Sequence, residues 1–328
     1  MLIFGLLFLS AIAVAAPPQD TFTGVGRIVA TGDVHGDFEA FQTLLRSAGL
    51  IDKKDKWSGG KTHLVQTGDI LDRGPESRKV MDLLMALEKQ ASKAGGRVHT
   101  LIGNHEAMNL YGDLKYVSPE EFAAFRTADS EPNRTLLWEQ TIRTLPSKPT
   151  GEFRKQWEAE HPLGWVEHRM AFGPEGSYGK WLRTRNTVVR INDALFLHGG
   201  ISPLFATASI TGINEAVRAK LNDFSAIKEG DVIIGDDGPL WYRGLAKPAG
   251  DELAAHVDQV LAAQSVKYIV TGHTPTNGQI EQRFGGKVLL IDIGMSAPFG
   301  RRGSACLVLE NGSAYVIDHG VRSTLGPR

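Results

Sequence analysis

Two hydrophobic patterns alternate along the first third of the chain. Short apolar runs that end in glycine and polar residues predict buried strands, and each is followed by apolar residues at helical spacing. The run RIVATGDVHG precedes a predicted helix with an apolar face of Phe38, Phe41, Leu44 and Leu45. The run THLVQTGDILDRG precedes a helix from Pro75, and RVHTLIGNHE supplies a third strand. Strands that alternate with helices predict an α/β architecture with a parallel or mixed sheet.

The pattern changes between residue 107 and about residue 180. This segment is charged, contains Trp and Pro, and shows helical stretches such as SPEEFAAFR and GEFRKQWEAEH without a clear strand. Strands return with ALFLHGG, KYIVTGHTP and KVLLIDIGMS, and a hairpin with an Asn311-Gly312 turn follows. Sheet-forming sequence flanks the segment on both sides. We therefore expect a helical insert at about 107–180 within a single domain of residues 17–328.

The first 16 residues, MLIFGLLFLSAIAVAA, form an apolar run before two prolines. Ala13-Val14-Ala15 fits the small-x-small pattern of signal-peptidase cleavage, so we interpret residues 1–16 as a signal peptide. No Lys or Arg begins the run, which leaves an uncleaved anchor or a misplaced start codon as alternatives. Cleavage predicts a periplasmic or secreted protein without stable membrane insertion. The alternatives predict a membrane-anchored or cytoplasmic one.

Composition narrows the choice of partners and chemistry. Lys and Arg total 36 against 37 for Asp and Glu, so the net charge of −1 gives no electrostatic reason to expect a nucleic-acid partner. The single cysteine, Cys306, excludes an intrachain disulfide, and its place in the predicted hairpin favours a buried apolar role. A cysteine-dependent phosphatase would need an arginine six residues later, where this chain has Gly312. The oligomeric state leaves no sign in the sequence.

One pattern, an apolar strand followed by glycine and polar residues, recurs five times, as GDVHG, GDILDRG, GNHE, HGG and GHTP. The polar residues fall where each predicted strand ends, and the C-terminal edge of such sheets collects site residues. We therefore expect six side chains to converge: Asp33, His35, Asp69, Asn104, His198 and His273. The remaining histidines lack this setting and are expected to be structural or superficial: His63, His99, His161, His168, His256 and His319.

The predicted ligand set has two carboxylates, one amide, three imidazoles and no thiolate. Oxygen and nitrogen ligands of this kind suit Mn, Fe or Zn. Six ligands exceed the needs of one tetrahedral ion, so we expect two divalent metal ions about 3.5 to 4 Å apart that share one carboxylate.

The order and spelling of the five clusters resemble the PPP-type metallophosphatases of the calcineurin-like phosphoesterase superfamily. That pattern runs GDxHG, GDxxDRG, GNHE, HGG and a later His. The stretches WLRTRNTVVRINDALFLHGGIS and GPLWYRG resemble the Shewanella-like protein phosphatase branch. The resemblance covers roughly residues 27–110 and 178–300. It implies an α/β fold, a β-sandwich of two mixed sheets flanked by helices, with a helical insertion.

The resemblance also implies how the metal ligands divide. Asp33, His35 and Asp69 would bind one metal ion, and Asp69 would bridge to the second. The second ion would take the remaining ligands, Asn104, His198 and His273. A water between the ions would be deprotonated near neutral pH and attack phosphorus in line.

Further roles follow from the same resemblance. His105 would be the general acid, and Asp72 would orient its ring and raise its basicity. Arg73 would bind the phosphoryl group, since a planar guanidinium grips two phosphate oxygens. Arg243 is the candidate for a second phosphate arginine, and Asn104 lies where it would also meet substrate. For Arg73 the alternative is an arginine at the start of a helix, paired with a nearby carboxylate.

These features predict a metal-dependent phosphomonoester hydrolase, specifically a protein phosphatase acting on phosphotyrosine or phosphoserine/threonine in proteins or peptides. One alternative is hydrolysis of dinucleoside polyphosphates or other small phosphoesters. Asp72 before Arg73, where that group usually has Asn, and Glu106 rather than Asp argue against it. The alternative from another class is a non-catalytic phospholigand-binding protein, which would be expected to lack the acid or an arginine.

Several neighbouring residues keep two interpretations. Arg183 and Arg185 fit phosphate-side or structural roles equally. Asp292 could accept a hydrogen bond from a ligand histidine or simply end its strand, and Glu106 is expected to orient its loop. The insert supplies five aromatic residues that could line a substrate groove or form the insert's own core: Tyr111, Tyr116, Trp157, Trp165 and Tyr178.

Overall fold

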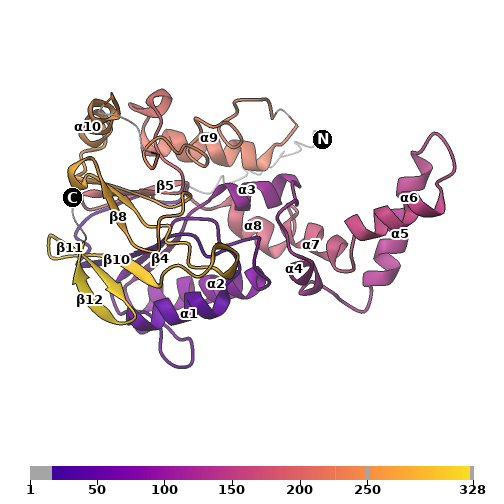
Figure 1. Ribbon diagram of the computed structural model, residues 1–328, viewed down its shortest axis with the longest axis horizontal. Coiled ribbons are helices and arrows are strands. Elements are labelled where there is room, and N and C mark those ends of the chain that lie inside the picture. The colour runs from indigo at the N-terminus through magenta and orange to yellow at the C-terminus, as the bar shows by residue number, and fades with distance from the viewer. Residues whose placement is uncertain (1–16, 226, 248–251, 326–328) are drawn as a thin grey trace, which may run out of the picture.

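The computed structural model describes residues 17–225, 227–247 and 252–325. Residues 1–16 lie outside this range, so the signal peptide and the cellular location stay predictions. Two six-stranded mixed sheets stack at the centre, with helices on their outer faces (Figure 1). This arrangement confirms the predicted α/β sandwich.

The first sheet has the order β12-β11-β10-β2-β3-β4. Its parallel strands are the first three predicted ones: β2 (Arg27–Thr31), β3 (His63–Gln66) and β4 (Arg97–Thr100). The C-terminal meander adds antiparallel strands: β10 (Ala305–Glu310), β11 (Ser313–Asp318) and β12 (Val321–Thr324). The turn between β10 and β11 is Asn311-Gly312, and both residues have positive φ, as the predicted hairpin requires.

The second sheet has the order β1-β5-β6-β7-β9-β8. Its central strands run parallel: β6 (Ala194–Leu197), β7 (Tyr268–Thr271) and β9 (Val288–Leu290). Antiparallel neighbours lie on either side, and a short parallel strand pairs with β5 at one edge: β5 (Val188–Ile191), β8 (Glu281–Arg283) and β1 (Thr21–Phe22).

Amphipathic helices cover the outer faces of both sheets. Beside the first sheet lie α1 (Phe38–Ser47) and α2 (Ser77–Lys93), and beside the second lie α9 (Ile210–Asn222) and α10 (Glu252–Gln264) (Figure 1). The predicted apolar face of α1 is buried except for Phe38, which is half-buried, and α2 buries Val80, Leu83, Leu84 and Leu87. Helix α2 begins at Ser77 rather than at Pro75, because Glu76 takes a non-helical backbone conformation.

Six helices occupy the fully described stretch between β4 and β5, which contains no strand. They are α3 (Asn104–Tyr111), α4 (Pro119–Ala123), α5 (Ser130–Arg143), α6 (Gly151–Glu160), α7 (Trp165–Phe172) and α8 (Ser177–Arg183). Helices α5 and α6 project away from the sandwich (Figure 1). Three short 3₁₀ turns complete the described elements: η1 (Pro203–Phe205), η2 (Phe284–Gly286) and η3 (Ala297–Phe299).

One apolar core joins both sheets. Fully buried members come from the first sheet (Val29, Val65 and Leu307) and from the second (Phe196, Val270 and Leu289). This packing aligns the carboxyl ends of β2, β3, β6 and β7 along one edge. None of the helices in the described residues is long and apolar enough to cross a membrane.

Candidate metal centre

The six predicted ligand side chains meet at this edge, and each is buried. Asp33 and His35 follow β2, and Asp69 follows β3. The other three come from the start of α3 and from the loops after β6 and β7: Asn104, His198 and His273. The parallel strands bring them together because all of these strands end at the same edge.

The backbone is strained where these side chains are placed. Positive φ angles occur at His35 (44°), Asp69 (55°), Asp72 (68°), Arg73 (67°) and His273 (68°). Such angles are uncommon for residues with a Cβ and cluster at functional sites, where the surrounding fold holds them. The loops are therefore shaped for the position of these side chains rather than for local stability.

Close approach of two loops explains one glycine of the third cluster. A Cβ added at Gly103 would lie only 2.3 Å from Oδ1 of Asp69. That same oxygen accepts a hydrogen bond from the backbone N–H of His105 at 3.0 Å. Only a residue without a Cβ lets the start of α3 reach the Asp69 carboxylate.

Two buried clusters of potential metal ligands lie side by side and share Asp69. One contains His35, Asp69 and His105, and the other contains Asp69, His198 and His273. Asp33 lies at the first cluster, with Oδ2 at 3.8 Å from Nε2 of His35. A shared carboxylate between two clusters is the arrangement of a binuclear metal site.

The hydrogen bonds of His198 test whether cations fit here. Its Nδ1 lies 3.0 Å from the carbonyl oxygen of Thr67, which can only accept, so Nδ1 carries the proton. The other ring nitrogen, Nε2, is the one that a metal ion would use, and it lies 3.0 Å from Oδ1 of Asn104. The same nitrogen lies 3.2 Å from Oδ2 of Asp69. Three potential ligand atoms thus converge on one point, as a bound cation requires.

His35 and His273 follow the same rule. Nδ1 of His35 lies 2.9 Å from the carbonyl oxygen of Leu71, and Nε2 of His273 lies 3.1 Å from that of Trp241. Each ring thus turns its unprotonated nitrogen to the cluster. Burial lowers the pKa of His35 to about 3 and that of His273 well below its usual range, which keeps both neutral. Neutral imidazoles with a fixed tautomer are what metal ligation requires.

The carboxylates also favour a bound cation. Burial, with Asp292 and Asp69 nearby, raises the pKa of Asp33 well above its usual range. A divalent cation would relieve this repulsion and hold the carboxylates ionised. Asp292 faces Asp33, and its Oδ1 accepts a hydrogen bond from the N–H of Gly294 at 3.0 Å. Neither of the two interpretations predicted for Asp292 included its contact with Asp33. The residues present fit two divalent ions.

His105 and Asp72 form a buried pair next to the clusters. Nδ1 of His105 lies 2.6 Å from Oδ2 of Asp72, and Nε2 lies 3.9 Å from Oδ2 of Asp69. Burial alone would lower the pKa of His105, but the carboxylates of Asp69 and Asp72 outweigh it and raise that pKa. Asn109 donates to Oδ1 of Asp72 at 2.8 Å. Sequence reasoning missed Asn109, although its place one helical turn after His105 is a usable signal.

Glu106 holds two site loops together, as expected. Its Oε2 accepts the N–H groups of Asp69 at 2.8 Å and Gly103 at 2.7 Å, and its Oε1 accepts that of Ile70 at 2.9 Å. One carboxylate thus fixes the backbone of the shared ligand relative to the start of α3.

The predicted phosphate arginines both lie at the site. Arg73 lies with its guanidinium 4.4 Å from the ring centroid of Tyr116. Arg243 donates to the carbonyl oxygen of His273 at 2.5 Å and to Oγ1 of Thr274 at 3.0 Å, which places it beside a ligand histidine. Among the described residues Arg73 forms no ion pair with a carboxylate, whereas the alternative expects one.

Arg183 and Arg185 have structural roles. Arg183 donates to the carbonyl oxygens of Leu221 and Phe172, and Arg185 pairs with Glu88 at 2.7 Å. Among the five insert aromatics, Tyr178 and Trp157 are buried, and only Tyr116 contacts residues of the site in a ring interaction. Core packing thus applies to Tyr178 and Trp157.

The remaining sulfur and imidazole groups match their predicted structural or surface roles. Cys306 is fully buried, and burial raises the pKa of its thiol to about 12. His63 and His99 hydrogen-bond each other at 3.0 Å, and His168 lies among phenylalanine rings. His319 is exposed.

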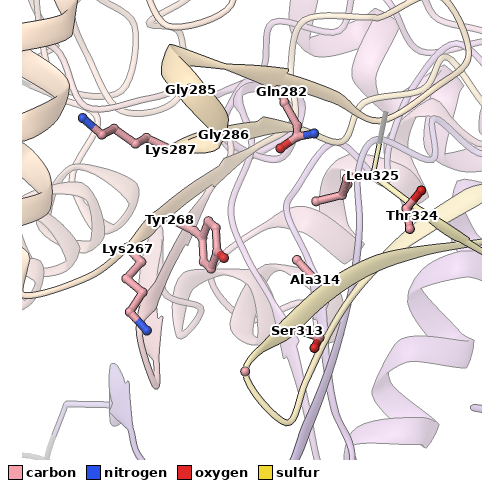
Figure 2. A pocket seen from close by; sticks show the side chains of 11 residues that line it. Lys267, Tyr268, Gln282, Gly285, Gly286, Lys287, Ser313, Ala314, Thr324 and Leu325 are labelled. Carbon is pink, nitrogen blue, oxygen red and sulfur yellow. The ribbon is translucent and has the colours of Figure 1, made fainter. Parts of the chain in front are cut away.

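A separate open hollow of about 820 Å³ lies near the amino ends of β7 and β9 (Figure 2). The metal clusters lie at the carboxyl end of β7, so this hollow belongs to a different region. Its two lysines, Lys267 and Lys287, are paired with Asp193 and Asp258. It therefore offers no unpaired lysine for an anion.

Both the sequence and the fold of this chain are similar to those of known proteins. The family model described as calcineurin-like phosphoesterase matches residues 26–277. Shewanella-like protein phosphatase 2 of Arabidopsis thaliana is 32% identical over 291 residues, which cover 85% of this chain and 73% of that protein. Shewanella-like protein phosphatase 1 of Plasmodium berghei is 31% identical over 278 residues, 83% of this chain and 67% of that protein. The crystal structure of a cold-active protein-tyrosine phosphatase from a psychrophilic Shewanella species superposes with a TM-score of 0.72 at 31% identity, covering 94% of this chain and 83% of that one.

Proposed function

The chain belongs to the calcineurin-like phosphoesterase family, and from this premise we propose that it hydrolyses phosphate monoesters on proteins or peptides. The observation that carries the proposal is the His105–Asp72 pair directly beside the carboxylate that both ligand clusters share. A proton donor at that place is what the departing alkoxide or phenoxide of a phosphomonoester needs.

Six residues of the chain would hold two divalent metal ions. Asp33, His35 and Asp69 would hold one divalent ion, and Asp69 would hold the second with Asn104, His198 and His273. When bound, these ions would neutralise phosphoryl charge and acidify a water. Mn, Fe and Zn all suit this set of ligands.

Arg73 and Arg243 would bind the phosphoryl oxygens, since each guanidinium offers paired N–H donors to an anion. Asn104 would contribute its side-chain amide to substrate binding as well. His105 would give its proton from Nε2 to the leaving oxygen, while Asp72 keeps the ring oriented through Nδ1. No covalent enzyme intermediate is needed.

The printed names of the relatives support a protein substrate. Two are named protein phosphatases and one a protein-tyrosine phosphatase, and each is 31% or 32% identical over most of this chain. We therefore propose phosphoproteins or phosphopeptides as substrates, with phosphotyrosine and phosphothreonine as the residues to compare.

The proposal is tested by side-by-side rates. We would measure kcat/KM on a phosphotyrosine peptide, on a phosphothreonine peptide and on diadenosine tetraphosphate. A preference for either peptide supports a protein phosphatase. A strong preference for the dinucleotide would replace it with a small-molecule hydrolase. Binding of phosphopeptide without hydrolysis would favour a non-catalytic protein.

A further inference from the structure

The guanidinium of Arg73 lies over two aromatic rings. Its central carbon is 4.4 Å from the ring centroid of Tyr116 and 5.2 Å from that of Phe299. Both distances lie within the range of about 6 Å over which a ring face attracts a cation. Tyr116 comes from the insert between α3 and α4, and Phe299 ends η3 after β9. Segments far apart in the sequence therefore meet at one side chain.

Arg73 is held without a carboxylate. None of the ion pairs among the described residues includes it, and its Nε is buried without a hydrogen-bond partner. A carboxylate would occupy the N–H donors that a phosphate needs and would cancel the charge. Aromatic faces attract the cation and leave its donors free.

Both rings are anchored to the site. The Tyr116 ring lies 5.1 Å from the His105 ring, and the backbone N–H of Arg73 donates to the carbonyl oxygen of Tyr116 at 2.9 Å. The Phe299 ring lies 5.2 Å from the His35 ring. The start of η3 is fixed by a hydrogen bond from the N–H of Ala297 to Oδ2 of Asp37 at 3.0 Å.

We propose that Tyr116 and Phe299 form an aromatic clamp that positions Arg73 for phosphate binding. This inference rests on the proposed function, since it assigns Arg73 to the phosphoryl group. Tyr116 and Phe299 are positioning residues that act through the guanidinium. The clamp also gives the insert a direct part in substrate binding, because one of its two rings comes from the insert.

The first test compares Tyr116→Ala and Phe299→Ala with wild type, using the metal-loaded protein. We expect KM for the phosphopeptide and Kd for inorganic phosphate, measured by calorimetry, to rise about three- to thirtyfold, the range that such contacts support. We expect kcat to change less, because Arg73 grips phosphate in both the ground and transition states. Tyr116→Phe keeps the ring face and should stay within about twofold of wild type.

A double-mutant cycle shows whether the rings act through Arg73. In the Arg73→Ala background, Tyr116→Ala should add no further loss of phosphate affinity. An equal loss in both backgrounds, or unchanged affinity in both alanine variants of the clamp, would overturn the proposal. Unchanged affinity in Arg73→Ala would overturn it as well.

Controls separate this result from folding and from the proposed function. Arg322 lies 3.7 Å from the ring centroid of Tyr315 in the β11–β12 region, so Arg322→Ala removes a similar contact elsewhere and should leave phosphate binding unchanged. Melting temperature and metal content report on folding. Phosphate binding is read without turnover, so a wild type that binds phosphate but hydrolyses no phosphopeptide defeats the proposed function alone.

Discussion

Nδ1 of His105 lies 2.6 Å from Oδ2 of Asp72, inside a site where both side chains are buried. The contact assigns the Nδ1 proton to the hydrogen bond with Asp72 and leaves Nε2 facing the shared ligand Asp69. The imidazole is thus oriented as a proton donor at the centre of the two ligand clusters. The predictions that follow concern this donor, the loops around it, the phosphate arginines and the insert.

Replacing His105 by Asn should remove the proton donor while keeping a polar side chain. We expect kcat to fall by about two to four orders of magnitude, the usual cost of a lost general acid. Metal content and melting temperature should stay as in wild type. The control is His319→Asn at an exposed turn with positive φ, a conformation that Asn tolerates. Unchanged kcat in His105→Asn would remove this residue from the role.

Replacing Glu106 by Gln should loosen the loop that carries Asp69. The carboxylate accepts three backbone N–H groups, whereas an amide has a single acceptor oxygen, so at least one buried donor loses its partner. We expect the free energy of unfolding to fall by about 1–3 kcal/mol. Metal affinity should fall with it. Urea unfolding and metal analysis measure both, and exposed Glu131→Gln serves as the control. Wild-type stability together with full metal content would count against this role.

Replacing Arg243 by Lys should keep the charge and lose the planar pair of donors. We expect kcat/KM to fall by about ten- to a hundredfold, the size of a charged hydrogen bond to phosphate. The matched control is Arg185→Lys, since Arg185 pairs with Glu88 away from the site. Equal kcat/KM for the two variants would show that Arg243 has no part in phosphate binding.

His168 makes the insert sensitive to acid. Its ring is fully buried against Phe122, Phe125 and Phe172, neither nitrogen has a hydrogen-bond partner, and burial lowers its pKa to about 3. The unfolded chain takes up this proton below about pH 6.5, whereas the folded chain does not until about pH 3. Stability from this group is therefore full above pH 6.5 and is lost as the pH falls toward 3.

Replacing His168 by Leu should remove this loss. At pH 5 we expect the variant to be more stable than wild type by about 2 kcal/mol beyond any difference at pH 7. Urea unfolding at both pH values measures the effect. A difference between variant and wild type that is the same at pH 5 and pH 7 would contradict the assignment.

A large part of this structure could be predicted from the sequence, because site residues collect where the parallel strands of such sheets end. Asp33, Asp69 and His273 each follow a short apolar run, and parallel strands must end at a common edge. The convergence of Asp33 and Asp69, which follow strands of one sheet, could therefore be predicted, whereas the place of His273 also depends on how the second sheet stacks on the first. The hairpin at Asn311-Gly312 was equally readable, because few residues accept positive φ at both turn positions.

Other features could not be read in advance. Helix α5 has no apolar face, with Ser130 its one buried residue, so no periodic signal marked it. Tyr116 and Phe299 meet at Arg73 through tertiary packing between the insert and η3, which local patterns do not encode. The contact between Asp292 and Asp33 likewise depends on how the two sheets stack.

The central claim is that two divalent ions at the shared Asp69 make this protein a phosphomonoesterase. The most direct measurement is hydrolysis of phosphotyrosine and phosphothreonine peptides after EDTA treatment and after readdition of Mn, Zn or Fe, with metal content determined in parallel. We predict that chelation abolishes activity, that at least one metal restores it, and that the restored protein holds about two ions per chain. Full activity after verified metal removal, or no activity with any metal, would contradict the account.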